Sequence, residues 1–176
     1  NLQRVIDPMG NVTRFKYAQN HYLLEIIDAR GVRATRTEYD EDGRIVHQVN
    51  PLGDTLYFDH DLDNNTERTT DFLGYNTEYT YDERGNVLTK TDHIGAVWTY
   101  EYDSLDNLIR TVNPDLSETS SEFDSLGNEI KSTNELGYSS ERTYTNDGNL
   151  KTETNALGHT TSYDYDSNGN LLKVTG

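Results

Sequence analysis

The sequence predicts an all-β fold, in which tandem 21-residue β-hairpins form one continuous, curved antiparallel sheet. Three observations predict it. A ring-bearing side chain recurs every 21 residues, Gly, Asn and Asp recur at two fixed places in each 21-residue unit, and the segments between these places alternate in polarity. Regular turn signals separated by short alternating segments are typical of repeated β-hairpins.

The ring-bearing residue of each unit, here called the anchor, sets the phase of the repeat. From Tyr39 onward the spacing is constant, and one earlier anchor precedes Tyr39 by 22 residues. The extra residue lies between Gly31 and Tyr39, where we expect a β-bulge to absorb it. The anchors are Tyr17, Tyr39, His60, Tyr81, Tyr102, Phe123, Tyr144 and Tyr165.

A first turn follows each anchor, usually as Asp, then Gly and Asn four and five residues after the ring. The Asp side chain can accept backbone N–H groups two residues on, and Gly tolerates the left-handed conformation that closes such a hairpin turn. We expect Asn64 and Asp106 to replace Gly readily, and we expect strain or an altered turn at His21. The repeat signature comprises Tyr39, Asp40, Gly43, Tyr81, Asp82, Gly85, Asn86, Tyr102, Asp103, Asn107, Phe123, Asp124, Gly127, Asn128, Tyr165, Asp166, Gly169 and Asn170.

A second turn begins eleven residues after each anchor from Tyr17 to Tyr144 with Asp or Asn, and one more begins at Asp7. Gly follows three residues later except at Leu116, where we again expect strain. Strands of six to seven residues between the turns give about 17 strands. Open sheets rarely exceed about 10 strands without curling, so we expect this sheet to curl, close or pack against another copy. The alternative is a parallel β-roll, although the Gly-Gly-x-Gly-x-Asp pattern of calcium rolls is missing.

The charge balance restricts the partners. The formal net charge is −16, with 31 Asp and Glu against 15 Lys and Arg, whereas a nucleic-acid binder needs clustered basic residues. No apolar run approaches the roughly 20 residues of a membrane span. The chain has no Cys, which excludes disulfides and thiolate chemistry. We therefore expect no nucleic-acid partner and no membrane span.

Two acidic clusters resemble the start of a calcium-binding EF-hand loop, one at residues 59–64 and one at residues 164–169. The twelfth position of that loop should be Glu, but it is Thr70 in one cluster and Thr175 in the other. The repeat phase already accounts for both clusters as turn carboxylates. We also find no His pair at metal-ligand spacing and no nucleophile motif. The prediction is therefore a protein without catalytic residues, cofactor or metal, and not an enzyme.

Trp98, Tyr100 and Tyr102 share one face of a predicted strand, because successive side chains of a strand point to opposite faces. Under one interpretation the aromatic rings pack the sheet, and the anchors stack as a ladder from unit to unit. Under the other, Trp98 and Tyr100, flanked by carboxylates, are sugar-stacking platforms.

The repeat resembles the YD-repeat, or Rhs-repeat, family. The resemblance rests on YTYDERGNV (79–87) with TDHIG (91–95), on YDYDSNGNL (163–171), and on DPMGN (7–11) and NPLGD (50–54), and it covers essentially the whole chain. The family includes bacterial Rhs polymorphic toxins, C components of insecticidal toxin complexes, wall-associated proteins and animal teneurins. The resemblance implies a long antiparallel sheet that spirals into a hollow shell, which in bacterial members encloses a toxic C-terminal domain.

From this resemblance we expect residues 1–176 to be a single array of about eight repeats, cut from a larger secreted or cell-surface protein that is exported or delivered by contact. The leading function is a segment of a shell wall around a toxin or effector cargo, and the acidic balance suits a basic cargo. The alternative is a carbohydrate-binding or adhesive surface module. No self-cleaving segment is found, so cargo release does not carry over. The end strands near Asn1 and Thr175 would have unpaired edges that invite self-association.

Overall fold

The computed structural model describes residues 1–176 and contains seventeen β-strands and no helix, which confirms the predicted fold class. Without helices, the chain has no long apolar helix that could cross a membrane. The contacts within the chain divide it into two compact units. Unit 1 comprises Asn1–Thr80 with Thr91–Gly95, and unit 2 comprises Tyr81–Lys90 with Ala96–Gly176.

The strands of unit 1 are β1 (Arg4–Ile6), β2 (Val12–Tyr17), β3 (Leu23–Ile27), β4 (Arg33–Tyr39), β5 (Ile45–Val49), β6 (Thr55–Asp61), β7 (Thr66–Thr70) and most of β8 (Asn76–Tyr81). Unit 2 contains most of β9 (Val87–Thr91) and then β10 (Val97–Tyr102), β11 (Leu108–Val112), β12 (Glu118–Phe123), β13 (Glu129–Thr133), β14 (Ser139–Tyr144), β15 (Leu150–Thr154), β16 (Thr160–Tyr165) and β17 (Leu171–Thr175). The strands that carry an anchor have the expected six or seven residues, whereas the strands that follow the first turns have five.

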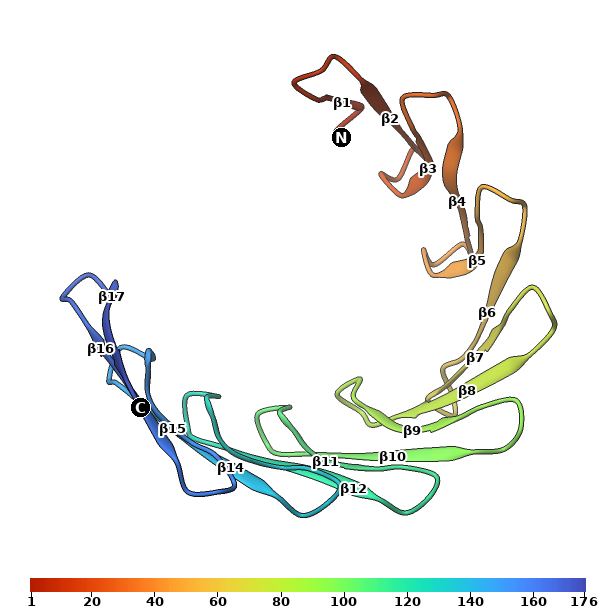
Figure 1. The fold of residues 1–176 in the computed structure, drawn as a ribbon. Helices are drawn as coiled ribbons and strands as arrows, with labels where there is room; N and C mark the ends of the chain where they lie inside the picture. Colours follow the sequence, from red (N-terminus) through yellow and green to blue (C-terminus); the bar gives the residue numbers. More distant parts are fainter. The chain divides into compact units, whose positions relative to one another are not determined.

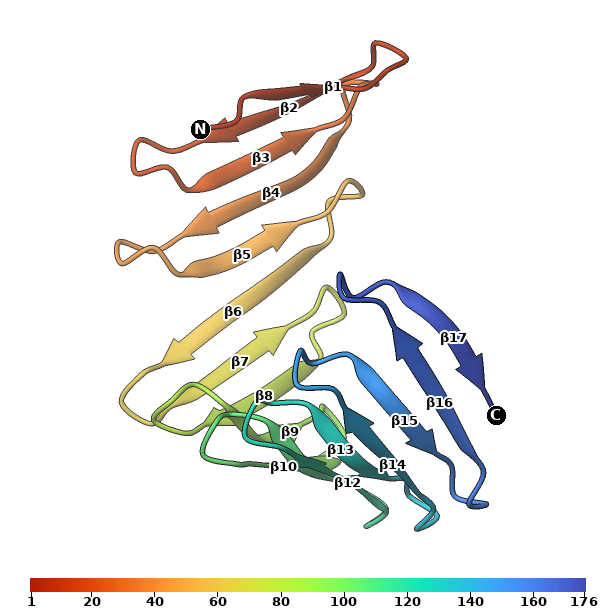
Figure 2. The ribbon, with the colours of Figure 1, turned by 90° about the vertical axis from the view of Figure 1, so that its left-hand side faces the viewer.

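Within each unit, every strand pairs antiparallel with its neighbour in the sequence (Figure 1). The arrows of successive strands therefore point in opposite directions, and from β10 to β17 the strand direction changes progressively, as the right-handed twist of β-strands requires (Figure 2). The parallel roll is thus the wrong alternative, and the hairpin prediction is confirmed.

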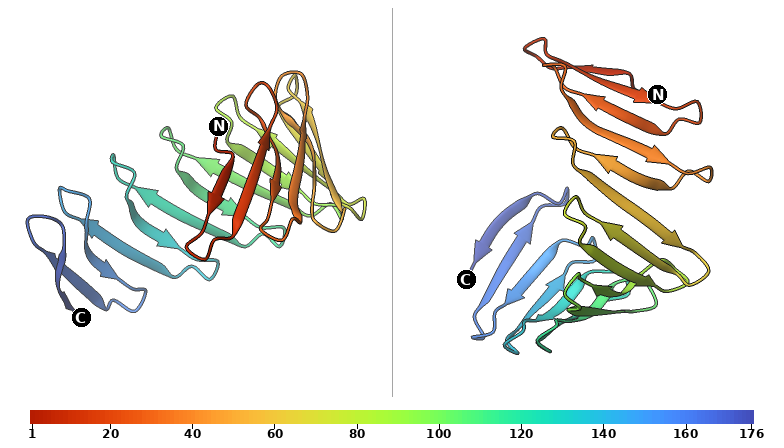
Figure 3. Two further views of the ribbon diagram at one scale, coloured as in Figure 1. Left: turned by 90° about the horizontal axis from the view of Figure 1, so that it is seen from above. Right: turned by 90° about the vertical axis from the view of Figure 1, so that its right-hand side faces the viewer.

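The first turns lie at one end of the strands of each sheet, and the second turns lie at the other end (Figure 3). Most turns are closed by the same pair of backbone bonds. At Asp124, for example, the Gly127 N–H donates to the Asp124 carbonyl at 3.1 Å, and the Asp124 N–H donates to the Asn128 carbonyl at 3.0 Å. This is a type I turn followed by a left-handed residue, and Gly127 has φ +83°.

The 22-residue repeat between Tyr17 and Tyr39 contains the expected β-bulge. Ile26 pairs with Thr35 and Ile27 pairs with Arg33, so Ala34 is the extra residue on β4. The bulge restores the phase before the anchor Tyr39, and every later anchor keeps the period.

One turn departs from the prediction. Asn65, and not Asn64, takes the left-handed conformation, with φ +51°. The cause lies in the pairing of β6 with β7, which continues to Asp61 and Thr66 without a shift in register. The loop of this hairpin is therefore residues 62–65, and its last residue closes the turn. The expectation for Asp106 is confirmed, with φ +65°.

The sheet has no hydrophobic core of its own. No apolar side chain is fully buried, and Thr37, 5% exposed, is the one buried polar residue. The accessible surface is 12,191 Å², whereas a compact 20.1-kDa monomer would expose about 8,700 Å². Both faces of the sheet are therefore open, and strand pairing and side-chain contacts along each face hold the structure.

Candidate functional site

The signature residues of the first turns bind one another. In the turn at Asp103, one carboxylate oxygen accepts the N–H groups of Leu105 at 2.8 Å and Asn107 at 3.0 Å, and the other accepts the Asn107 side-chain amide at 2.9 Å. The Asn107 amide is the main cause that holds the pKa of Asp103 below its usual range. The turns at Asp82, Asp124 and Asp166 share this geometry and the lowered pKa. The signature therefore fixes the turns.

The two turns expected to be strained are strained. His21 has φ +71° and Leu116 has φ +68°, in the region that favours glycine. The turn at Leu116 is also altered. The Ser117 N–H donates to the Asp115 carboxylate at 3.0 Å, while the Asn113 amide donates to the Ser117 hydroxyl and to Glu135.

The two faces of each sheet differ in chemistry. One face, here called the aromatic face, carries rings such as Phe15, Phe58, Trp98 and Tyr100 with cross-strand hydroxyl and aliphatic partners; Tyr100, for example, pairs with Thr111. The other face, here called the charged face, carries ladders of ion pairs. Side chains on the aromatic face are half-buried by their neighbours, whereas those on the charged face of the same strands are mostly exposed.

On the charged face, acidic and basic side chains alternate across neighbouring strands. In unit 1 the Glu25 carboxylate lies 2.7 Å from Lys16 and 3.1 Å from Arg33. In unit 2 Arg110 lies 2.6 Å from Glu101 and 2.5 Å from Glu118. These pairs neutralise many of the carboxylates on this face, so the excess negative charge lies largely in the turns.

The anchors do not stack on one another as predicted. They lie on alternate strands, and at about 4.8 Å per strand two anchors are about 10 Å apart, beyond the 4.5–7 Å of a ring contact. Instead, polar tips reach the preceding unit. The Tyr39 hydroxyl donates to the Leu23 carbonyl and the Tyr144 hydroxyl to the Glu129 carbonyl, each at 2.9 Å. These two anchors therefore join consecutive repeats by a hydrogen bond.

His60 occupies the anchor position with a ring that keeps this contact. Its Nε2 lies 2.8 Å from the Ile45 carbonyl oxygen, and its Nδ1 lies 2.8 Å from Glu67. Both partners belong to the neighbouring strands, so His60 serves in the sheet as the tyrosines do.

The residues of the predicted sugar platform lie together on the aromatic face of β10, and both are half-buried. The ammonium group of Lys90 lies 4.7 Å from the centre of the Trp98 ring and occupies one face of it. Burial raises the pKa of the neighbouring Tyr102, and the charge of Asp82 adds to this effect. The site offers one open ring face at most at Trp98.

The acidic clusters at residues 59–64 and 164–169 serve the sheet. The Asp61 carboxylate accepts two bonds from Asn64, at 2.7 and 3.2 Å, and Asp59 pairs across the ladder with Arg68. Asp166 accepts the N–H groups of Asn168 and Asn170, each at 2.9 Å. No group of three acidic, His or Cys side chains converges on a common point.

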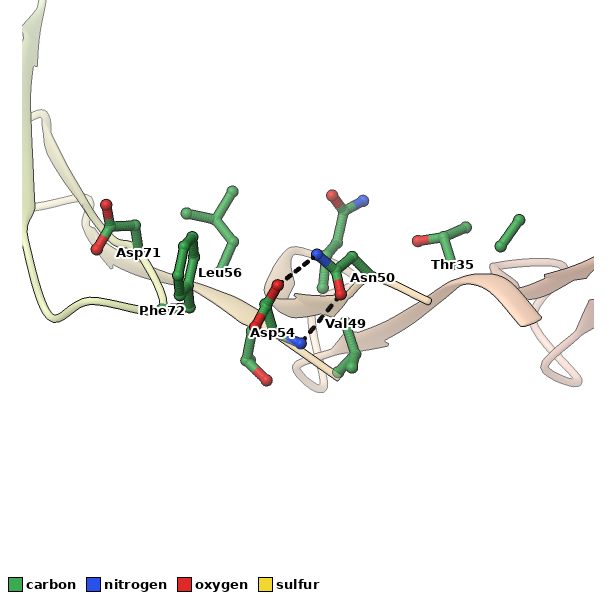
Figure 4. A pocket seen from close by; sticks show the side chains of 10 residues that line it. Thr35, Val49, Asn50, Asp54, Leu56, Asp71 and Phe72 are labelled. Atoms are coloured by element: carbon green, nitrogen blue, oxygen red, sulfur yellow. Dashed lines mark hydrogen bonds between the residues drawn. The ribbon is translucent and has the colours of Figure 1, made fainter. Parts of the chain in front are cut away.

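A hollow of about 300 Å³ in unit 1 is lined at its two ends by two irregularities of the repeat (Figure 4). One irregularity is the bulge residue Ala34. The other is Phe72, which occupies the turn position where three other repeats have Pro. The Phe72 ring stands beside Leu56, and Thr35 closes the far end. The inserted residue and the unusual Phe72 are visible in the sequence, but the sequence does not show that they line one hollow.

The RHS Repeat family model matches residues 81–117 and 144–176. These segments contain the turns and anchors described above, and the other units keep their phase. These two segments identify the repeats of the chain as RHS repeats. Its repeats are structural modules, in which the signature residues close turns and join consecutive hairpins. A comparison with curated proteins gives no match.

Among solved structures, this RHS-repeat chain is similar to a mutant Tc holotoxin pore of Photorhabdus luminescens, with a TM-score of 0.54 and 17% identity over 94% of this chain and 12% of that chain. A TcdB2–TccC3–Cdc42 complex matches with a TM-score of 0.49 and 14% identity, over 93% of this chain and 14% of that one. The chain thus spans about one eighth of the length of these structures. At this identity, the first likeness shows a shared fold.

Proposed function

We propose that the chain is one segment of the wall of an RHS-repeat shell, and that the complete shell encloses a C-terminal toxin or effector domain of a secreted protein. The observation that supports this most is the missing core. A single layer that exposes about 3,500 Å² more than a compact protein of its mass gains little from folding alone. A wall has this construction, since it needs two surfaces and no buried hydrophobic core.

The wall acts passively under this proposal. Backbone pairing closes it to water and protease, and anchors such as Tyr39, His60 and Tyr144 join their hairpins to the preceding ones. The 176 residues form a single repeat array in this role, and the residues of the period serve the scaffold. The structural neighbour is a Tc toxin, and the toxin cargo in our proposal is based on this similarity.

Protease protection tests the proposal in the parent-length protein that carries this segment. We expect the C-terminal domain to resist protease while the wall is intact. Thr99→Pro places a proline within β10, where it removes a ladder bond and opens the wall. Glu83→Ala in an exposed turn is the control. Cleavage of the C-terminal domain at the same rate in all three proteins would contradict the proposal.

We further propose that the enclosed domain is basic. The chain has 31 carboxylates and 15 basic groups, so its net charge of −16 would attract a basic domain. Binding of the chain to a small basic protein should weaken as salt increases, because a Debye length shortens from about 10 Å at 0.1 M to about 3 Å at 1 M. An acidic protein of equal size serves as control. Equal binding of both proteins would remove this proposal.

Carbohydrate binding is the second candidate, and the half-buried Trp98 with one ring face free of Lys90 supports it. A glycan array with the wild-type chain and with Trp98→Ala tests it. Binding that disappears in the variant is the expected result, and no binding above background to any glycan would eliminate it.

A further inference from the structure

Three consecutive second turns of unit 1 expose large apolar side chains at the same end of the strands. We call this set the apolar rim patch; its members and their exposed fractions are Leu52 (87%), Phe72 (62%), Leu73 (61%), Tyr75 (48%) and Ile94 (76%). The turns are neighbours in space. The ring of Tyr75 stacks on that of His93 in the next turn at 4.2 Å, and the hollow beside Phe72 is lined from the preceding turn by Asn50 and Asp54.

The turns themselves do not require these side chains. Leu52, Leu73 and Ile94 occupy the third position of their turns. This position is apolar in six of the eight second turns, but Arg30 and Asp115 occupy it in the other two. A site that accepts charge elsewhere in the same chain has no structural need for Leu or Ile. Their exposure also shows that they contribute little to packing within the chain.

The opposite end of the strands of unit 1 is different. The third positions of its first turns are Asn20, Asp42 and Asp63, all polar. Leu62, 59% exposed, is the one large apolar side chain exposed in these first turns, so the apolar side chains are concentrated at the second turns. A contiguous apolar patch of a few hundred Å² on a soluble protein marks an interaction site.

We propose that the apolar rim patch docks against the same patch of a second copy of this chain. Taking about 100 Å² for an aliphatic side chain and about 200 Å² for an aromatic one, these exposed fractions correspond to on the order of 400 Å² of apolar surface. A standard interface buries about 800 Å² per partner, slightly more than half of it apolar. One patch therefore supplies about the apolar share of one side.

The patch is also self-complementary, which a twofold interface requires. It contains projections, the exposed tips of Leu52 and Ile94, and beside Phe72 it contains a hollow of about 300 Å³. In a twofold arrangement a tip of each copy enters the hollow of the other. This inference concerns the chain's own association and does not depend on any cargo.

Charge opposes this association and supplies a second measurable property. Asp54 and Asp71 border the patch, and each copy carries a net charge of −16. Salt screens this repulsion. The dimer should therefore be weak at low salt and should strengthen as salt is raised, opposite to the behaviour of an interface held by ion pairs.

Analytical ultracentrifugation of the chain at 0.05 and 1 M NaCl tests the proposal. We expect a monomer–dimer equilibrium that tightens with salt. The double variant Leu52→Arg/Ile94→Arg should lose at least tenfold in association constant, although it lowers the net charge to −14 and so reduces the repulsion. The matched control, Leu105→Arg/Leu126→Arg, changes charge equally at exposed first-turn positions and should associate as wild type does.

Two results would overturn the proposal. One is a wild-type chain that remains monomeric at 1 M NaCl across the accessible concentrations. The other is a double variant that associates like wild type, which would assign the contact to the edge strands. Circular dichroism checks the fold of the variant, which Arg30 at an equivalent position leads us to expect intact. If the arginines unfold it, Leu52→Ser/Ile94→Ser makes the same test with the same expected loss.

Discussion

Replacing Leu116 by Gly should relieve strain that the structure places at one residue. Leu116 has φ +68°, a left-handed conformation that costs an L-residue roughly 1–2 kcal/mol. The side chain is 82% exposed, so little burial is lost with it. Glycine adds backbone entropy to the unfolded chain, at a cost of roughly 0.5–1 kcal/mol. The net expectation for Leu116→Gly is a gain of about 0.5 kcal/mol in the free energy of unfolding.

Leu157→Gly is the matched control. Leu157 lies two units later in another second turn, is 80% exposed, and has no left-handed backbone. Its replacement carries the entropic cost without relief of strain, so we expect a loss of roughly 0.5–1 kcal/mol. The two variants should therefore differ by roughly 1–2 kcal/mol.

Equilibrium unfolding in urea measures this difference. With a slope of about 2 kcal/mol per M, the unfolding midpoints of the two variants should lie roughly 0.5–1 M apart, with Leu116→Gly the higher. Equal midpoints for the two variants would refute the reasoning, because they would show that the turn at Leu116 stores no strain.

Three further predictions use the same assay. Tyr144→Phe removes the hydroxyl that donates to Glu129 and should cost about 1 kcal/mol, whereas Tyr138→Phe at a 59% exposed ring should cost nothing measurable; equal costs would contradict the inter-unit bond. Asn65→Gly should be neutral or stabilising and Asn64→Gly destabilising, and the reverse order would restore the sequence-based assignment. Because hydrogen bonds lower the pKa of the turn aspartates, the stability that these bonds contribute is complete above the ordinary aspartate pKa of about 3.9 and is lost as the pH falls through the lower folded values; a midpoint that already falls between pH 7 and 5 would point to other groups.

The sequence predicted the strands and turns well because each unit repeats a local code. Asx at the head of a turn and Gly at its end determine a hairpin without help from distant residues. The inserted residue before Tyr39 was assigned to a bulge for the same reason, and the structure has that bulge at Ala34.

Contacts between strands were harder to predict. The left-handed residue at Asn65 depends on how far β6 and β7 remain paired, which spacing alone does not show. The anchor ladder was wrong because a period in sequence is two strands in space, so consecutive anchors are not neighbours. The hollow beside Phe72 is lined by residues from three repeats, and no local sequence pattern predicts that they line one hollow.

The measurement that tests the wall most directly is hydroxyl-radical footprinting of this segment, alone and within the parent-length protein. Trp98 and Tyr100 report on the aromatic face, and Tyr57, 53% exposed, reports on the charged face. A wall has one interior and one exterior, so one face should lose labelling severalfold in the parent protein while the other keeps it. Equal labelling of both faces in the two samples, or protection of both faces in the parent, would contradict the account.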